Sequence, residues 1–276
     1  MRRKASDRIF LILLVGLLVL RFPVLLIPHY GLLPISKETA LMFFENGTYL
    51  LTAIMVLLKR DALADYHIDR FALVLLTLAP IGLCLSEYLL RGWEHVQLSG
   101  WVNAGISIGL LLALLVWKPA LPKRGARKTL LWVGIAIAVG LLWSVVAGYL
   151  IHLQRGAQSL VGMALPQMIF RAFVAIFIQL GNAATIEEPL FRGFLWGFLK
   201  ERHWKEKWIW LFQALLFMLG HIYYLGSANY SFFLVVPLGA LLLGWMAWRS
   251  RSIGTSMIVH GIGNSLAGNL FSFLRW

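Results

Sequence analysis

Residues 130–151 read LLWVGIAIAVGLLWSVVAGYLI, a stretch that carries no charged side chain. A helix needs roughly 20 mainly apolar residues to cross a hydrocarbon core of about 30 Å. The preceding residues, 123–128, are rich in lysine and arginine. This contrast is typical of a transmembrane helix that follows a basic turn.

Apolar stretches of similar length recur along the whole chain. Hydrophobic residues make up 60% of the 276 residues, charged residues only 13%, and the mean hydropathy is +0.77. Soluble domains are about 45–50% apolar and about 25% charged. Strand-like alternation is absent, so we expect helices, which satisfy their own backbone groups in lipid. The sequence predicts an all-α polytopic transmembrane helical bundle of about eight or nine spans, at residues 9–27, 39–58, 71–90, 99–117, 130–151, 166–199, 208–225, 231–248 and 253–272.

Most of the 25 basic residues fall in alternate turns. These turns are residues 2–8, 59–70, 118–128, 200–207 and 249–251, whereas the opposite turns hold only Lys37, Arg91, Arg155 and Arg275. By the positive-inside rule, the N-terminus is expected in the cytoplasm. The net charge of +13 thus reflects membrane topology, with lipids and not nucleic acid as partners. With no organelle signal, we expect a bacterial plasma membrane.

The stretch 166–199 is too long for a simple span, because its residues would extend about 50 Å as a helix. It must tilt, protrude or break. A break is predicted near Gly181 and Asn182, where residues 185–188 (TIEE) resemble a capping box and Pro189 follows.

Three short segments in the last third place polar groups inside apolar stretches: EEPLFR at 187–192, FMLGH at 217–221 and HGIGN at 260–264. Ionisable groups within spans are costly and usually mark a function or a paired contact. Glu188 and Arg192 have the i, i+4 spacing of an ion pair, so Glu187 projects from another side of the helix. A purely structural buried network remains an alternative interpretation.

The chemistry of these groups suits the activation of water. Counted from the basic turns, Glu187, His221 and His260 can lie at a similar depth. Glu187 could then take a proton from water beside His221, while His260 and Asn264, four residues apart, could hold an oxyanion. Alternatively, Glu187, His221 and His260 could bind zinc.

The motifs EExxxR, FxxxH and HxxxN, in this order, resemble those of the CPBP intramembrane proteases, which include type II CAAX prenyl endopeptidases and relatives associated with bacteriocins. Glu187, Glu188 and Arg192 match the first motif, Phe217 and His221 the second, and His260 and Asn264 the third. The resemblance implies an intramembrane endopeptidase that acts on a membrane-associated or C-terminally tagged peptide. It also implies that Glu187 and His221 activate the water and that His260 and Asn264 hold the oxyanion, with Glu188, Arg192 and Phe217 in support.

Residues 161–276 are therefore predicted to form the catalytic core, and residues 1–160 an uncharacterised helical scaffold. A metal-free mechanism is favoured, because an amide such as that of Asn264 is a rare zinc ligand and a natural oxyanion donor. Within the scaffold, Arg21 and Glu45 are expected to pair structurally. A non-catalytic immunity or binding protein and a small proton-coupled carrier are the competing functions.

Overall fold

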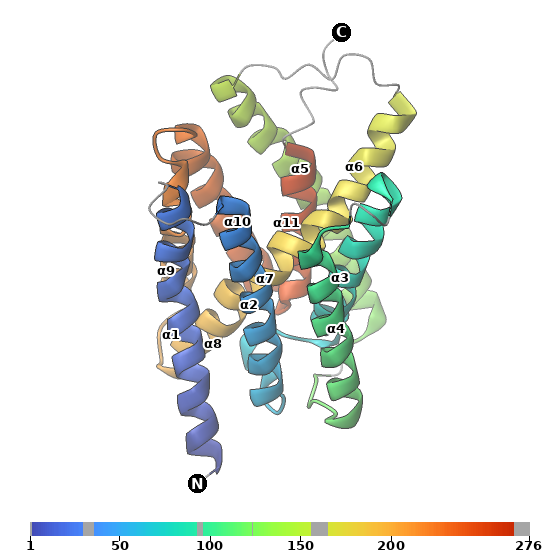
Figure 1. Ribbon diagram of the computed structural model, residues 1–276. Helices are drawn as coiled ribbons and strands as arrows, with labels where there is room; N and C mark the ends of the chain where they lie inside the picture. The colour runs from blue at the N-terminus through green and yellow to red at the C-terminus, as the bar shows by residue number, and fades with distance from the viewer. Residues whose placement is uncertain (1, 30–35, 93–95, 123, 156–164, 268–276) are drawn as a thin grey trace.

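The computed structural model describes residues 2–29, 36–92, 96–122, 124–155 and 165–267 (Figure 1). Every regular element within these residues is helical. The first half contains α1 (Arg2–His29), α2 (Lys37–Leu58), a short η1 (Leu63–Tyr66), α3 (Arg70–Arg91), α4 (Leu98–Val116) and α5 (Ala126–Arg155). The second half contains α6 (Leu165–Gln179), η3 (Leu180–Ala184), α7 (Thr185–Glu188), η4 (Pro189–Leu195), α8 (Trp196–Glu201), α9 (Glu206–Leu219), η5 (Ile222–Tyr224), η6 (Ser231–Val235), α10 (Val236–Ser250) and α11 (Ile253–Ala267).

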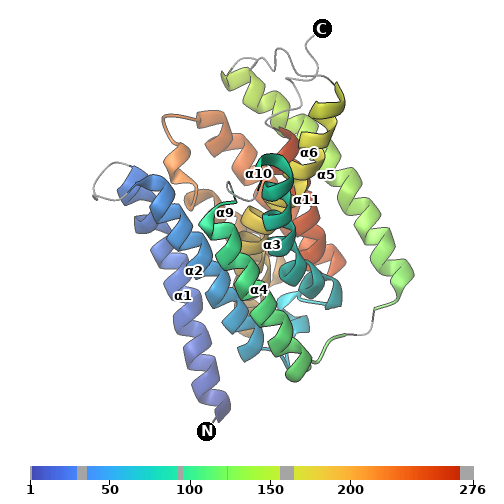
Figure 2. The ribbon, with the colours of Figure 1, turned by 45° about the vertical axis from the view of Figure 1, so that its right-hand side comes forward.

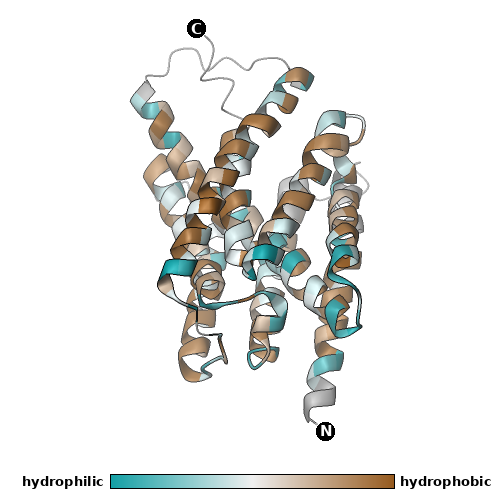
Figure 3. Ribbon diagram, turned by 180° about the vertical axis from the view of Figure 1, so that it is seen from behind, coloured by the Kyte–Doolittle hydropathy of each residue, from teal (hydrophilic) through white to brown (hydrophobic). Residues whose placement is uncertain are grey.

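The helices are those of a membrane bundle. Five described segments are long and apolar enough to cross a bilayer, namely Arg70–Leu90, Leu98–Val116, Ala126–Gln154, Pro166–Glu201 and Ser231–Ser250. Met42–Leu58 is a shorter apolar helix, and α9 and α11 have 14 and 15 residues. Apolar residues predominate along the helices, and polar residues gather in several of the connecting turns (Figure 3). The predicted fold class is confirmed.

The long stretch after residue 165 does not break. Helix α6, η3, α7, η4 and α8 follow one another without a gap and cross the bundle obliquely (Figure 1). The backbone stays right-handed helical at the joints, with φ −67° and ψ −35° at Ala184 and φ −61° and ψ −39° at Pro189. Both η3 and η4 are π-helical. A tilted helix with two widened turns therefore replaces the predicted break.

The capping box predicted at Thr185 is also wrong. Ala184, not Thr185, precedes α7, and no side chain caps it. The Thr185 hydroxyl instead donates to the carbonyl of Leu180, at 2.5 Å. Since the helix continues through this point, the first N–H groups of α7 are not free ends that need a cap. π-Turns inside helices are frequent at functional sites.

The basic turns meet at one end of the bundle. Lys59 Nζ lies 2.8 Å from Asp7 Oδ1 of α1. Asp69, which caps α3, accepts hydrogen bonds from Arg124 at 3.0 Å and from Ser252 at 2.8 Å. The turns that the charge pattern assigned to one side of the membrane therefore do lie together. Which side faces the cytoplasm stays a prediction.

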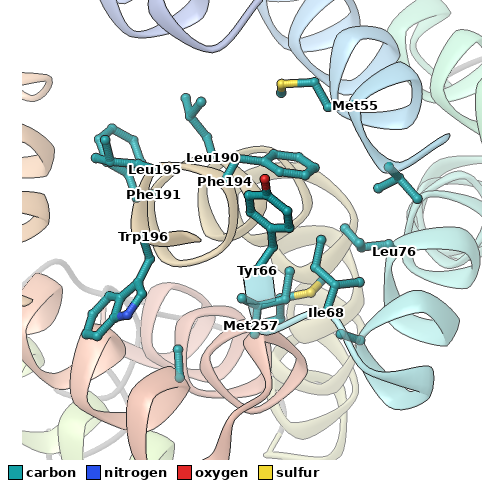
Figure 4. Packing of buried hydrophobic residues seen from close by; sticks show 14 of the residues in the cluster. Met55, Tyr66, Ile68, Leu76, Leu190, Phe191, Phe194, Leu195, Trp196 and Met257 are labelled. Carbon is teal, nitrogen blue, oxygen red and sulfur yellow. The ribbon is translucent and has the colours of Figure 1, made fainter. Parts of the chain in front are cut away.

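A buried aromatic core holds η4 in the centre of the bundle. Tyr66 and Phe194 are fully buried with ring centroids 5.7 Å apart, and Phe10 of α1 lies 5.6 Å from Phe194. Side chains of α2, η1, α3, η4 and α11 converge on the same cluster (Figure 4). Helices in lipid are held together by van der Waals packing of this kind. The segment η4, which directly follows the candidate acids of α7, is therefore anchored by packing from both halves of the chain.

Helix α11 packs against α5, α6 and η3, in the interior of the bundle (Figure 2). The approach to η3 requires a glycine, because a Cβ on Gly261 would lie 2.7 Å from Leu180 Cγ. Small residues permit such close helix contacts in membranes. The neighbouring residue, His260, is thereby carried close to α7.

Candidate active site

Glu187 lies between two imidazole rings that come from other parts of the chain. Its Oε1 is 3.7 Å from His221 Nε2, and its Oε2 is 3.7 Å from His260 Nε2. All three residues are buried, with exposed fractions of 9%, 8% and 6% respectively. The three groups that the sequence predicted at a similar depth therefore do meet. They come from helix α7, the turn after α9 and helix α11.

In each imidazole, the contact made by Nδ1 fixes the orientation of the ring. His221 Nδ1 lies 2.8 Å from the carbonyl of Phe217, which only accepts, so this nitrogen carries the hydrogen. His260 Nδ1 lies 2.7 Å from Glu188 Oε1. In the neutral form, both rings then present an Nε2 lone pair toward Glu187. Each ring is thus prepared to accept a hydrogen bond from a water molecule at Glu187.

His221 is not inside its helix. Helix α9 ends at Leu219, and His221 occupies the following turn with φ −108° and ψ 18°. Its bond to the Phe217 carbonyl satisfies one of the acceptors that a helix leaves free at its C-terminus. The FxxxH spacing therefore places His221 just after the end of α9, where its bond to Phe217 holds the ring at the wall of the cavity.

Glu188 and Arg192 form the predicted i, i+4 pair, and both are completely buried. Arg192 Nη1 lies 3.2 Å from Glu188 Oε1, and Nη2 donates to the carbonyl of Ala240 at 3.2 Å. Because Glu188 also binds His260, this acid joins η4 to α11. Glu188 faces the protein interior while Glu187 faces the cavity, as their positions on the helix predict.

The ring of Phe217 packs against both His221 and Arg192. Its ring centroid lies 4.5 Å from that of His221 and 5.1 Å from that of Phe191. The Arg192 guanidinium carbon lies 4.3 Å from the Phe217 ring centroid, which is cation–π contact distance. Phe217 thus supports both the imidazole and the buried cation.

The groups open on a cavity of about 450 Å³. Its polar and charged lining includes Arg21, Glu45, Glu187, His221, His260 and Asn264. Asn264 is exposed, and its amide nitrogen donates one bond to Gln179 Oε1 at 3.4 Å. An amide has two hydrogens, so one remains for another acceptor. All four residues predicted as catalytic, Glu187, His221, His260 and Asn264, therefore line the cavity.

Arg21 of α1 is the residue of this cavity that the sequence interpretation misplaced. Arg21 forms its ion pair with Glu187 and not with Glu45, the partner expected from the sequence. Glu45 lines the same cavity and interacts electrostatically with Arg21. The available signal was the cost of an arginine within a span, which demands a buried partner. Hydropathy and local spacing do not identify a partner in another part of the chain.

The residues fit zinc poorly. Among the described residues, no group of three or more His, Cys, Asp or Glu side chains is arranged to hold a metal ion. In addition, the guanidinium of Arg21 already contacts Oε1 of Glu187. A divalent ion on the same oxygen would stand beside a fixed positive charge, which opposes its binding.

One part of the chain matches a known protein family. Residues 162–266 match the family model described as Type II CAAX prenyl endopeptidase Rce1-like. Over these residues the chain is similar to that family. No curated protein matches the chain, and no solved structure does. The matched residues include Glu187, His221, His260 and Asn264. They do not include Arg21 and Glu45, so the cavity draws two charged groups from outside the match.

Proposed function

We propose that the protein is an intramembrane endopeptidase in which Glu187 and His221 activate the attacking water. The observation that carries this proposal is the placement of the Glu187 carboxylate 3.7 Å from each of two Nε2 atoms at the wall of a buried cavity. A general base must lie within reach of the proton that it takes, directly or through one water. A water molecule seated between Glu187 and His221 meets that requirement.

The proton passes from the water to Glu187 as the water oxygen attacks the peptide carbonyl. The carboxylate becomes a neutral acid, and the carbonyl oxygen becomes the anion of the tetrahedral intermediate, so the charge of the cavity does not change. Glu187 then returns the proton to the leaving amine as the C–N bond breaks. His221 holds the water through Nε2, with its ring fixed by Phe217.

His260 and Asn264 are proposed to stabilise the oxyanion. Asn264 offers its second amide hydrogen. His260 can donate from Nε2 only as an imidazolium, because its Nδ1 hydrogen is directed to Glu188. Glu188 accepts from Nδ1, so its part is to orient the His260 ring.

The substrate is proposed to be a membrane-associated or C-terminally tagged peptide. The description of the matched family points to a prenylated C-terminal peptide as one class. Binding pockets commonly span about 300–1,000 Å³, so a cavity of about 450 Å³ suits a short peptide segment. A farnesylated C-terminal peptide and an unmodified apolar membrane peptide are therefore the two probes to compare.

Replacement of His221 tests the activity. Purified protein in liposomes should cleave at least one of the two probes, and His221→Asn should lower kcat by about 10²- to 10⁴-fold. Asparagine keeps a donor near the position of Nδ1 but has no counterpart of Nε2. Mass spectrometry of the products measures cleavage. His203→Asn, in the turn after α8, is the matched control and should retain wild-type kcat.

Full activity of His221→Asn would remove His221 from the mechanism. A wild type that cleaves neither probe would favour a non-catalytic binding or immunity protein, in which the polar cluster is a structural network. Removal of zinc distinguishes the metal-free mechanism from a zinc-dependent version of the protease. In the metal-free mechanism, cleavage should continue after zinc is removed, and metal analysis of the active preparation confirms the removal. Loss of cleavage upon chelation, restored by stoichiometric zinc, would favour the metal version with Glu187, His221 and His260 as ligands.

The protein is further proposed to lie in a bacterial plasma membrane with its basic turns in the cytoplasm. In a Cys84→Ala background, Ser227→Cys should react with a membrane-impermeant maleimide in intact cells. Asp61→Cys, in the basic turn after α2, should react only after lysis. Both side chains are exposed at their turns. The reverse pattern of labelling would invert the topology.

A further inference from the structure

Arg21 joins the first helix to the candidate catalytic acid. Its Nη2 donates to Glu187 Oε1, and the arginine is only 3% exposed. Glu187 Oε1 also faces His221, while Oε2 faces His260. With Oε1 held by a buried cation, rotation of the carboxylate is restricted and Oε2 is left facing His260.

The guanidinium itself is held in a slot. Its central carbon lies 5.9 Å from the ring centroid of Phe44 and 5.6 Å from that of Phe191, which are cation–π distances. The third wall is Gly220, immediately before His221. A Cβ on Gly220 would lie 2.7 Å from Arg21 Nε and 3.1 Å from Arg21 Cδ. The absence of a side chain at Gly220 therefore leaves the room that Arg21 occupies.

We propose that Arg21 is a positioning residue that holds Glu187 in the orientation required for water activation. The proposal rests on the proposed function. It means that α1, outside the matched residues 162–266, completes the active site. A carboxylate has about four acceptor sites, so Glu187 can take the proton of water while Oε1 still accepts the hydrogen bond from Arg21. The contact then persists through the step and keeps the acid in place to return its proton.

Three variants test this role. Arg21→Met removes the cation, Arg21→Lys keeps a cation without the planar fork, and Gly220→Ala displaces Arg21 while its charge remains. The backbone of Gly220 has φ −62° and ψ −11°, which alanine adopts without strain. Arg8→Met, exposed on the same helix, is the control. Each is assayed for kcat, KM and thermal unfolding in detergent with the probe that the wild type cleaves.

Arg21→Met should lower kcat by about 10²-fold, because small displacements of a catalytic group have effects of that size, with KM changed less than threefold. Arg21→Lys and Gly220→Ala should give intermediate values, and Arg8→Met should equal the wild type. The graded loss of kcat in folded protein is what a structural role would not produce.

Two other results would overturn the proposal. An increase in KM at unchanged kcat would show that Arg21 binds substrate, and a kcat that falls only in proportion to the folded fraction would show a structural contact. Failure of the proposed function is recognised separately, because the wild type would then cleave neither probe. A fully active wild type with a fully active Arg21→Met refutes the role of Arg21 alone.

Discussion

Glu187→Gln is expected to lower kcat by about 10²- to 10⁴-fold, the contribution typical of a general base. The amide cannot take a proton from water at neutral pH. Its carbonyl oxygen can still accept the hydrogen bond that Glu187 now accepts from Arg21. The variant should therefore fold, and its KM should stay close to that of the wild type.

The measurement is cleavage of the active probe in liposomes, under single-turnover conditions that isolate the chemical step. Glu201→Gln is the matched control, because Glu201 ends the same long helical segment and binds Tyr66 at the basic end, away from the cavity. It should retain wild-type kcat. Cleavage by Glu187→Gln at the wild-type rate would remove Glu187 from the mechanism.

Arg192→Met should produce the largest loss of stability. The substitution leaves the Glu188 carboxylate buried without its guanidinium partner, and both side chains are completely inaccessible in the native protein. Breaking a buried ion pair by removal of one member costs about 3–5 kcal/mol. Thermal unfolding in detergent, followed by tryptophan fluorescence, measures the change. Arg202→Met, an exposed arginine over Phe198, should change stability by no more than about 0.5 kcal/mol.

The double variant Glu188→Gln/Arg192→Met distinguishes the cause. It removes both charges, so it should recover part of the stability that Arg192→Met loses. Its kcat should be lower than that of the wild type, because the amide that replaces Glu188 can accept from His260 Nδ1 but carries no negative charge. If the double variant is no more stable than Arg192→Met, the stability lost in Arg192→Met comes from packing against Phe217 and not from the unpaired charge.

Much of the site was accessible from local sequence patterns. The spacing of Glu188 and Arg192 predicted their ion pair, and equal depth along separate helices predicted that Glu187, His221 and His260 meet. These inferences succeeded because helical rise and rotation are regular. The predicted break near Gly181 failed, since two π-turns allow the helix to continue through Pro189. The division at residue 160 stays a prediction, and Arg21 shows that the first part contributes directly to the cavity.

The sequence alone determined that this chain is a helical membrane bundle with acids and imidazoles in its last third, because hydropathy and helical periodicity act over neighbouring residues. Only the tertiary structure decided which nitrogen of each ring faces Glu187 and which cation accompanies it. Arg21 and Glu187 are 166 residues apart in the chain. Their contact depends on how α1, α2 and η4 pack around the guanidinium and on the missing side chain of Gly220, and no local pattern encodes that arrangement.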